Sequence, residues 1–276
     1  MQIATTIAQA RALFDVFAQP LGLVPTMGAL HEGHLALVRR ARADCLSVAA
    51  SLFVNPMQFG ADEDLAKYPR DFERDRAKLE EAGVDVLFAP EPGTMYPPGF
   101  SSAIDVGTLG TVYEGAIRPD HFRGVATVVA KLLNVVRPEV LYLGQKDAQQ
   151  TAVVRKMVRD LDVPVHVHVV ETVRESDGLA MSSRNAYLTA EQRSQAVTLN
   201  RALVAMLAAI ESGATKAEAT ELARATLSSL ATPDYFDLVD ADTFEPLEAV
   251  RGPAFVIGAA RFGTTRLLDN LWVGRQ

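Results

Sequence analysis

Cysteine is almost absent from this 276-residue sequence: Cys45 is the single one, so an intrachain disulfide is impossible. A lone cysteine in an apolar stretch is typical of a small core residue. The sequence also lacks any run of about 18 apolar residues, so no membrane-spanning helix is expected. Its N-terminus shows no basic start followed by an apolar segment, which disfavours a targeting segment. We therefore expect a cytoplasmic protein with no membrane partner.

Basic residues are in the minority. The sequence has 27 Lys and Arg against 34 Asp and Glu, which gives a formal net charge of -7. This balance argues against a nucleic-acid partner bound through a large basic field, although a local cationic pocket stays possible. A dehydrogenase is disfavoured as well, because no Gly-x-Gly-x-x-Gly pattern follows a predicted strand.

What the sequence does contain is typical of a folded globular protein. Hydrophobic residues make up 49% and charged residues 22% of the chain, so intrinsic disorder is not expected. A chain of this size buries roughly 75% of its unfolded surface when it folds. The length therefore predicts one large domain or two modest ones.

Short apolar runs alternate with helix-like stretches over the first 170 residues. In the expected helix over 71–82, three apolar residues are available for burial: Phe72, Ala77 and Leu79. A repeated strand–helix–strand order implies right-handed crossovers and a parallel sheet, so we expect an α/β, Rossmann-like doubly wound sheet. The expected strands are 21–24, 45–54, 84–88, 140–143 and 163–170, and the other expected helices are 34–42, 125–136 and 149–161.

The alternation of short apolar runs and helix-like stretches ends at about residue 177. Capping-box spacings at 189–192 and 215–218 predict helices that run to about residues 211 and 230. Short strands are then expected at 236–239, 254–260 and 266–268. Helices followed by short strands predict a smaller C-terminal α+β domain. We place the first domain at 1–175 and the second at 176–276.

A first polar cluster, residues 25–34, lies between the first expected strand and the helix after it. His31 and His34 are three residues apart at a helix N-terminus, where backbone N–H groups and the helix dipole favour phosphate. Gly28 and Gly33 would let the backbone approach a ligand closely. A His-x-x-His pair could also supply two zinc ligands. A pair of surface histidines on a turn is the third interpretation.

Three more polar clusters are present: two directly follow expected strands, and the third lies at the expected domain junction. Asn55 and Gln58 carry amides that suit a substrate with hydroxyl groups and a carboxylate, although an ordinary Asn-Pro turn is the favoured interpretation of these residues taken alone. Lys146 supplies a compact cation for phosphate, and Asp147 is a candidate helix N-cap. The segment 181–185 offers two hydroxyls and a guanidinium that can close over a triphosphate. Because three clusters lie at strand ends of one sheet, we expect them to form one site.

These clusters together resemble a known family. His31-x-x-His34 followed far downstream by residues 181–184 is similar to the paired signatures of the HIGH/KMSKS nucleotidyltransferase superfamily. Residues 25–34, 53–60, 118–125, 144–150 and 181–185, in this order, resemble the pantothenate synthetase (pantoate–β-alanine ligase) family. The resemblance spans essentially the whole chain, including 240–242 and 267–270. Ala148 departs from the aromatic residue common there, which predicts a packing change and not a lost activity.

The resemblance implies a two-step reaction. ATP and (R)-pantoate would give pantoyl adenylate and pyrophosphate, and β-alanine would then attack the acyl carbon to release pantothenate and AMP. It further implies Mg²⁺ with the ATP, for which the motifs identify no protein ligand, and a homodimer. An adenylation of this kind needs positioning and charge neutralisation and no protein nucleophile, which agrees with clusters of cations and amides.

The resemblance also implies roles for particular residues. His34 would donate a proton to the phosphates, and His31, Lys146 and Arg184 would complete the catalytic set. Pantoate and β-alanine would contact Gln58, Gln150, Asn55 and Arg118. ATP would contact Met27, Gly28, Ala29, Leu30, His31, Glu32, Gly33, His34, Gly144, Gln145, Lys146, Asp147, Val173, Met181, Ser182, Ser183 and Arg184.

Two rival functions belong to other classes. Another adenylating enzyme of the same superfamily, such as an aminoacyl-tRNA synthetase fragment, is disfavoured by the acidic balance and the short C-terminal part. A non-enzymatic nucleotide-binding regulatory module would predict loss of the cationic residues, whereas His31, Lys146 and Arg184 are all present.

Overall fold

The computed structural model describes residues 1–60, 65 and 68–274. The chain divides into two compact units: Met1–Gly144 with Val153–Val170, and Gln145–Ala152 with Glu171–Gln276. The domain boundary at 175/176 stays a prediction. The structure adds that residues 145–152 pack with the second unit, although they follow a strand of the first.

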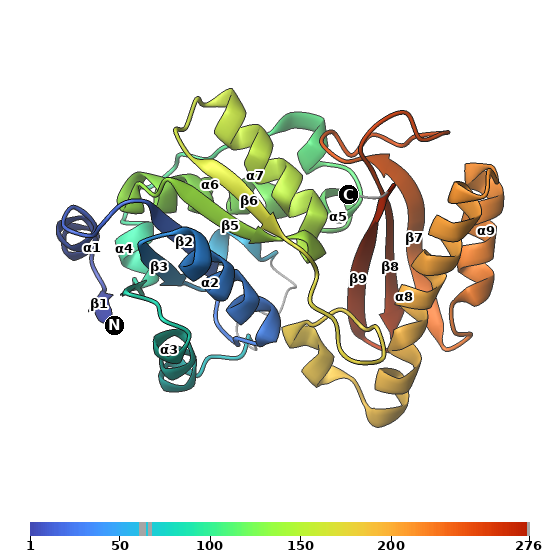
Figure 1. Cartoon of the computed structure of the whole chain (residues 1–276), viewed down its shortest axis with the longest axis horizontal. Helices are drawn as coiled ribbons and strands as arrows, with labels where there is room; N and C mark the ends of the chain where they lie inside the picture. The colour runs from blue at the N-terminus through green and yellow to red at the C-terminus, as the bar shows by residue number, and fades with distance from the viewer. Residues whose placement is uncertain (61–64, 66–67, 275–276) are drawn as a thin grey trace. The chain divides into compact units, whose positions relative to one another are not determined.

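The first unit is built on a six-stranded parallel sheet with the order β1-β4-β3-β2-β5-β6 (Figure 1). This confirms the predicted α/β, doubly wound class. The strands are β1 (Gln2–Ala4), β2 (Leu21–Thr26), β3 (Ser47–Leu52), β4 (Val86–Phe88), β5 (Val140–Gly144) and β6 (His166–Val170). The helices between them include α1 (Ile7–Phe14), α2 (Glu32–Asp44), α3 (Phe72–Glu81), α4 (Pro92–Met95), α5 (Glu114–Ile117), α6 (His121–Val136) and α7 (Ala148–Asp160).

One face of this sheet is covered by α2 and α3. Leu37, Val38 and Ala41 of α2 and Leu79 of α3 form a buried cluster with strand residues of that face. Cys45 belongs to the same cluster, as predicted for a core cysteine, and its Sγ lies 3.4 Å from the Tyr142 hydroxyl. On the other face, α6 packs against α1. Burial on both faces explains the nearly continuous apolar strands.

Several sequence predictions for this unit were wrong in detail. Phe72 and Ala77 are exposed, and the buried residues of α3 are Leu79 and the charged Asp75. Helix α6 begins at His121, four residues before the predicted start. Strand β2 was predicted to end before Pro25, but it continues through Pro25 to Thr26. Its pairing with β5 ends at Leu23, so the missing N–H of Pro25 removes no hydrogen bond between β2 and β5. The β1 strand and helix α1 were not predicted.

The sheet order reverses between β2 and β5. From β2 the chain moves outward to β3 and β4 on one side, and later to β5 and β6 on the other. β2 pairs with β5 only at Gly22 and Leu23, whereas its pairing with β3 runs over all six residues. The carboxyl ends of β2 and β5 therefore diverge at the topological switch point, where open α/β sheets bind ligands.

The second unit is a three-stranded antiparallel sheet with the order β7-β8-β9 (Ala231–Asp240, Ala254–Phe262 and Thr265–Val273). Helices α8 (Ala190–Glu211) and α9 (Lys216–Thr226) begin at the two predicted capping boxes and pack on one face. All three strands are longer than predicted, and α9 ends four residues earlier. The α+β class of this part is confirmed. On the opposite face, β9 contacts the short 3₁₀ helix η3 (Gln145–Asp147).

Candidate active site

Two histidines cap the N-terminus of α2. The Nδ1 atom of His31 accepts from the Gly33 N–H at 3.2 Å, and Nδ1 of His34 accepts from the His31 N–H at 3.3 Å. A ring nitrogen that accepts carries no proton, so this network assigns the proton of each neutral ring to Nε2. The rings lie with centroids 4.1 Å apart. The helix was predicted to start at His34, but His31 is its N-cap.

The loop before these histidines is held by helix α3. Both carboxylate oxygens of Asp75 accept backbone N–H groups, one from Ala29 at 2.8 Å and one from Leu30 at 2.9 Å. Lys78 Nζ donates to the Leu30 carbonyl oxygen at 2.5 Å. Gly28 and Ala29 have φ angles of 94° and 51°, a left-handed region that costs free energy for alanine. Sequence reasoning missed Asp75, because nothing local marks it as buried.

The amides of Asn55 and Gln58 meet in the 3₁₀ helix η1 (Pro56–Gln58), and both side chains are buried. Asn55 donates to Gln58 Oε1 at 3.0 Å and to the Gly124 carbonyl at 3.1 Å. Its own oxygen accepts from the Met57 N–H and from the Tyr96 hydroxyl. These four contacts use the whole hydrogen-bonding capacity of the Asn55 amide. Asn55 therefore holds Gln58 in place, and Gln58 is the better candidate to contact a substrate.

Arg118, the C-cap of α5, and His121, the first residue of α6, support the same turn. His121 Nδ1 lies 2.9 Å from the Gln58 carbonyl oxygen, and Arg118 Nη2 donates to that oxygen at 3.3 Å. The side-chain nitrogen of Gln58 lies 3.1 Å from Met27 Sδ. The structure thus brings together Met27, Asn55, Gln58 and Arg118, four residues that the sequence predicted for one site.

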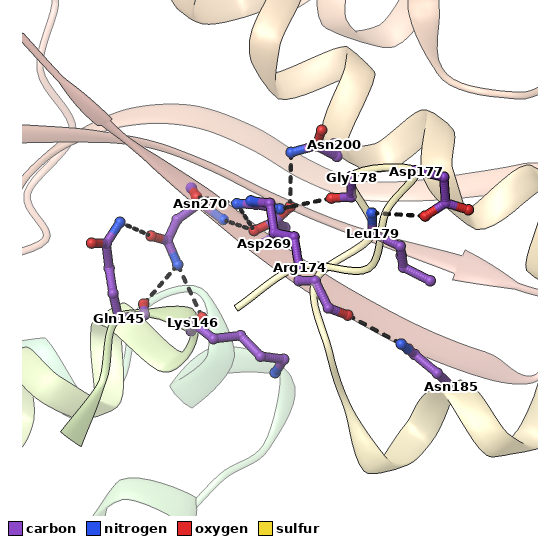
Figure 2. A network of polar contacts seen from close by, with 11 residues as sticks. Gln145, Lys146, Arg174, Asp177, Gly178, Leu179, Asn185, Asn200, Asp269 and Asn270 are labelled. Carbon is purple, nitrogen blue, oxygen red and sulfur yellow. Dashed lines mark hydrogen bonds and ion pairs between the residues drawn. The ribbon is translucent and has the colours of Figure 1, made fainter. Parts of the chain in front are cut away.

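In the second unit, Lys146 lies on η3, directly after β5. Its Nζ donates to Asp147 Oδ1 at 3.2 Å. The Asn270 amide of β9 donates to the carbonyl oxygens of Gln145, at 3.0 Å, and Lys146, at 2.9 Å. Figure 2 shows these contacts, in which Asn270 faces the backbone of the Lys146 segment. Ala148, the predicted departure from the family pattern, is buried at the start of α7.

The segment from Val173 to Met181 folds back on itself. The Met181 N–H donates to the Val173 carbonyl at 3.0 Å, and Arg174 and Ala180 form an antiparallel bridge. Ser182 caps the following 3₁₀ helix η4 (Ser183–Tyr187) by accepting from the Arg184 N–H at 3.2 Å. The Arg184 side chain is exposed. This hairpin thus leads directly into the hydroxyl and guanidinium groups predicted to meet a triphosphate.

Arg193 of α8 ties the hairpin to the helix. It donates to Asp177 at 2.8 Å and to Glu175 at 2.6 Å. The hydrogen bond from Arg193 holds the pKa of Asp177 below its usual value. At Gly178 the φ angle is 96°, which favours glycine. These contacts join the turn at Gly178 to α8.

The predicted site residues are therefore divided between the units. The first unit contains Met27–His34, Asn55, Gln58, Arg118 and Gly144, and the second contains Gln145–Asp147, Gln150, Val173 and Met181–Arg184. Within the described residues, no group of three His, Cys, Asp or Glu side chains is arranged to hold a metal ion. The helices of the described part include none that is long and apolar enough to cross a membrane.

Comparisons with known proteins agree with the resemblance found in the sequence. The sequence model of the family described as pantoate-beta-alanine ligase matches residues 2–272. Two similar curated proteins are the pantothenate synthetases of Roseiflexus castenholzii, 51% identical over 98% of both chains, and of Chloroflexus aggregans, 53% identical over 98% of this chain and 99% of the relative.

Solved structures give the same result. The crystal structure of pantothenate synthetase from Thermus thermophilus matches with a TM-score of 0.95 and 50% identity over 100% of both chains. The ligase from Francisella tularensis, complexed with beta-gamma ATP and beta-alanine, matches with a TM-score of 0.82 and 32% identity, over 100% of this chain and 99% of that one.

Proposed function

Because the chain belongs to the pantoate–β-alanine ligase family and is an enzyme of the pantothenate synthetase type, we propose that it condenses (R)-pantoate with β-alanine, using ATP. A pantoate carboxylate oxygen attacks the α-phosphorus of ATP, and pyrophosphate leaves. The β-alanine amine then attacks the acyl carbon of pantoyl adenylate. The products are pantothenate and AMP, for use in coenzyme A biosynthesis.

The observation that carries this proposal is the reciprocal capping of His31 and His34. Because Nδ1 of each ring is used in the cap, each neutral ring presents an Nε2–H donor at the positive end of α2. Donors fixed in this way stabilise the negative charge that develops on phosphate oxygens during adenylation. His34 is the proton-donating residue, and His31 assists it. Met27–His34 form one part of the ATP site.

Gly144 of the first unit and residues of the second unit supply the remaining ATP contacts in this proposal. Gly144–Asp147 bind ATP, with Lys146 on the phosphates and Asp147 near the ribose. Met181–Arg184 bind the triphosphate, and Val173 lines the adenine site. The fastened hairpin at Val173–Met181 supports this assignment, since catalytic groups gain from being held on ordered backbone.

Gln58 and Gln150 contact pantoate, and β-alanine also lies near Gln58. The hydrogen bond from Asn55 holds the Gln58 amide in one orientation, so Asn55 contributes mainly by positioning. Arg118 contacts the backbone of the same turn. The Francisella tularensis ligase, whose structure holds beta-gamma ATP and beta-alanine, supports ATP and β-alanine as ligands here.

Mg²⁺ accompanies ATP in this proposal. Magnesium is usually held through substrate phosphates and one or two carboxylates, and not by an all-protein cage. Bound there, Mg²⁺ would neutralise phosphate charge.

The test is to incubate the protein with ATP, pantoate and β-alanine and to count AMP and pyrophosphate. His34→Ala should slow pyrophosphate release from ATP and pantoate by at least ~100-fold, the scale for losing one transition-state donor. His166→Ala, at an exposed histidine on β6, is the matched control and should keep normal turnover. Near-normal pyrophosphate release in His34→Ala would contradict the role of His34.

Assembly and location complete the proposal. We expect a homodimer in the cytoplasm without nucleic-acid or membrane partners, and light scattering on a sizing column measures the mass directly. A monomer mass near 29.8 kDa would contradict the dimer.

A further inference from the structure

Two neighbouring residues of β9, Asp269 and Asn270, are polar and buried, with exposed fractions of 4% and 2%. Successive residues of a strand face opposite sides of the sheet. Asp269 faces the side covered by α8, where Asn200 contacts it, and Asn270 faces η3 on the other side. Buried polar side chains require partners, and both residues find theirs in segments far away in sequence.

Asn270 recognises the backbone of the Lys146 segment. Its amide nitrogen donates to two successive carbonyl oxygens, and its oxygen lies 3.3 Å from the Gln145 side-chain nitrogen. An amide nitrogen has two N–H groups, so both are used. Aspartate, an acceptor when ionised, could not make these two bonds. The contacts fix the point from which the Lys146 side chain extends.

Asp269 holds the hairpin that precedes Met181–Arg184. Arg174 pairs with both of its oxygens, at 2.7 and 3.0 Å. The same guanidinium donates to the Gly178 carbonyl oxygen at 3.1 Å and to the Asn270 carbonyl oxygen at 3.3 Å. Figure 2 shows that the Arg174 side chain meets β9 and the turn at Gly178 together. One strand position thus fixes the hairpin, and the next fixes the Lys146 segment.

We infer that Asp269 and Asn270 are positioning residues that set the spacing between Lys146 and the Ser182–Arg184 segment, and so match these groups to the triphosphate of ATP. This inference rests on the proposed function, in which both segments bind phosphate. Two loops held by one rigid strand keep a fixed separation, which a charged, extended ligand needs. Asp269 and Asn270 themselves need not touch the nucleotide.

The test compares Asn270→Asp, Asn270→Ser and Asp269→Asn with a matched control, Asp234→Asn. Asp234 forms a comparably buried ion pair with Arg266 on the same sheet, at 2.5 Å, with side-chain exposures of 17% and 14%. That pair joins β7 to the first residues of β9. Each variant is measured for KM of all three substrates, for kcat, for melting temperature and for hydrogen exchange without ligand.

Asn270→Asp should raise KM for ATP at least ~10-fold, because the carboxylate oxygens of the new side chain would face the carbonyl oxygens of Gln145 and Lys146 without a donor between them. KM for β-alanine should change much less. Exchange at residues 145–148 should rise in both Asn270 variants, and exchange at 174–181 should rise in Asp269→Asn. Asn270→Ser also removes both amide donors but places no charge at this buried position, so it should keep the fold if Asn270→Asp does not. Asp234→Asn should lower the melting temperature without a selective change in KM for ATP.

The inference is overturned if Asn270→Ser and Asp269→Asn match Asp234→Asn in KM for ATP and leave exchange at both segments unchanged. If the wild-type protein makes no pantothenate, the proposed function fails. The exchange measurements, which need no activity, then decide alone whether β9 orders the two segments.

Discussion

Among the residues of the first unit that are not proposed to contact a substrate, we expect loss of the Asp75 carboxylate to matter most. It is 2% exposed and accepts two backbone N–H groups of the loop before His31. In Asp75→Asn one oxygen remains as an acceptor, while an NH₂ group replaces the other and faces an N–H donor. The variant therefore loses one bond completely and converts the other from a charged to a neutral acceptor.

The magnitude follows from these two bonds. A hydrogen bond to a charged group contributes about 1.5–3 kcal/mol, and a neutral one about 1 kcal/mol. Losing one and weakening the other should reduce the free energy of unfolding by about 3 kcal/mol. For a chain of this size, 1 kcal/mol corresponds to roughly 2–4 °C, so the melting temperature should fall by about 6–12 °C. Pyrophosphate release should fall at least ~10-fold, because small displacements of His31 and His34 misplace their donors.

Asp71→Asn is the matched control. Asp71 is the exposed N-cap of the same helix and accepts from the Arg74 N–H at 3.1 Å. Asparagine caps helices as well as aspartate, so the melting temperature and kcat should stay near wild type. Differential scanning calorimetry and a pyrophosphate assay measure both variants. Equal melting temperatures and equal rates for Asp75→Asn and Asp71→Asn would refute the argument.

Gln58→Ala and Gln150→Ala should raise KM for pantoate more than KM for ATP, since a site built around hydroxyls loses its polar partners; unchanged KM for pantoate in both variants would contradict the assignment. ATP with pantoate should protect residues 178–188 from hydrogen exchange, and Arg184→Ala should abolish most of that protection, whereas Arg201→Ala at an exposed position of α8 should not. Because the folded-state pKa of Asp177 is lowered by Arg193, its contribution to stability is present above the ordinary pKa of 3.8 and is lost as pH falls below it; thermal scans from pH 6 to 3 should show a shallower decline in Arg193→Gln. Gly124→Ala should lower the free energy of unfolding by about 3 kcal/mol, because its Cβ would lie 2.3 Å from the Met57 carbonyl oxygen; Gly93→Ala, with open space around it, should melt near wild type.

Local signals in the sequence predicted most of the elements. The two capping boxes placed the starts of α8 and α9 correctly, because each box satisfies its own helix N-terminus within four residues. β1 was missed because its three residues form a strand only by pairing with β4, which lies more than 80 residues later. Such pairing leaves no periodic pattern in a short segment.

In the candidate site too, local signals predicted some residues, whereas residues that depend on distant contacts were missed. His31, His34 and Lys146 were predicted for the site because residue type and position after a strand already indicate phosphate chemistry. The supporting residues Asp75 and Asn270 act through backbone groups 45 to 125 residues away. An acidic residue on a helix is normally solvated, so sequence alone assigned Asp75 no role. Contacts of this kind depend on the tertiary fold.

The dependence of the Lys146 segment on β9 has a consequence for synthesis of the chain. Lys146 and Asn270 are separated by 124 residues. A ribosome adds roughly 5–20 residues per second, so about 6–25 s pass between their appearances. During this interval the Gln145 and Lys146 carbonyl groups remain without the Asn270 amide, because β9 emerges only after them. A nascent chain interrupted before residue 270 would therefore contain every predicted phosphate-binding residue and still lack the strand that orders two of their segments.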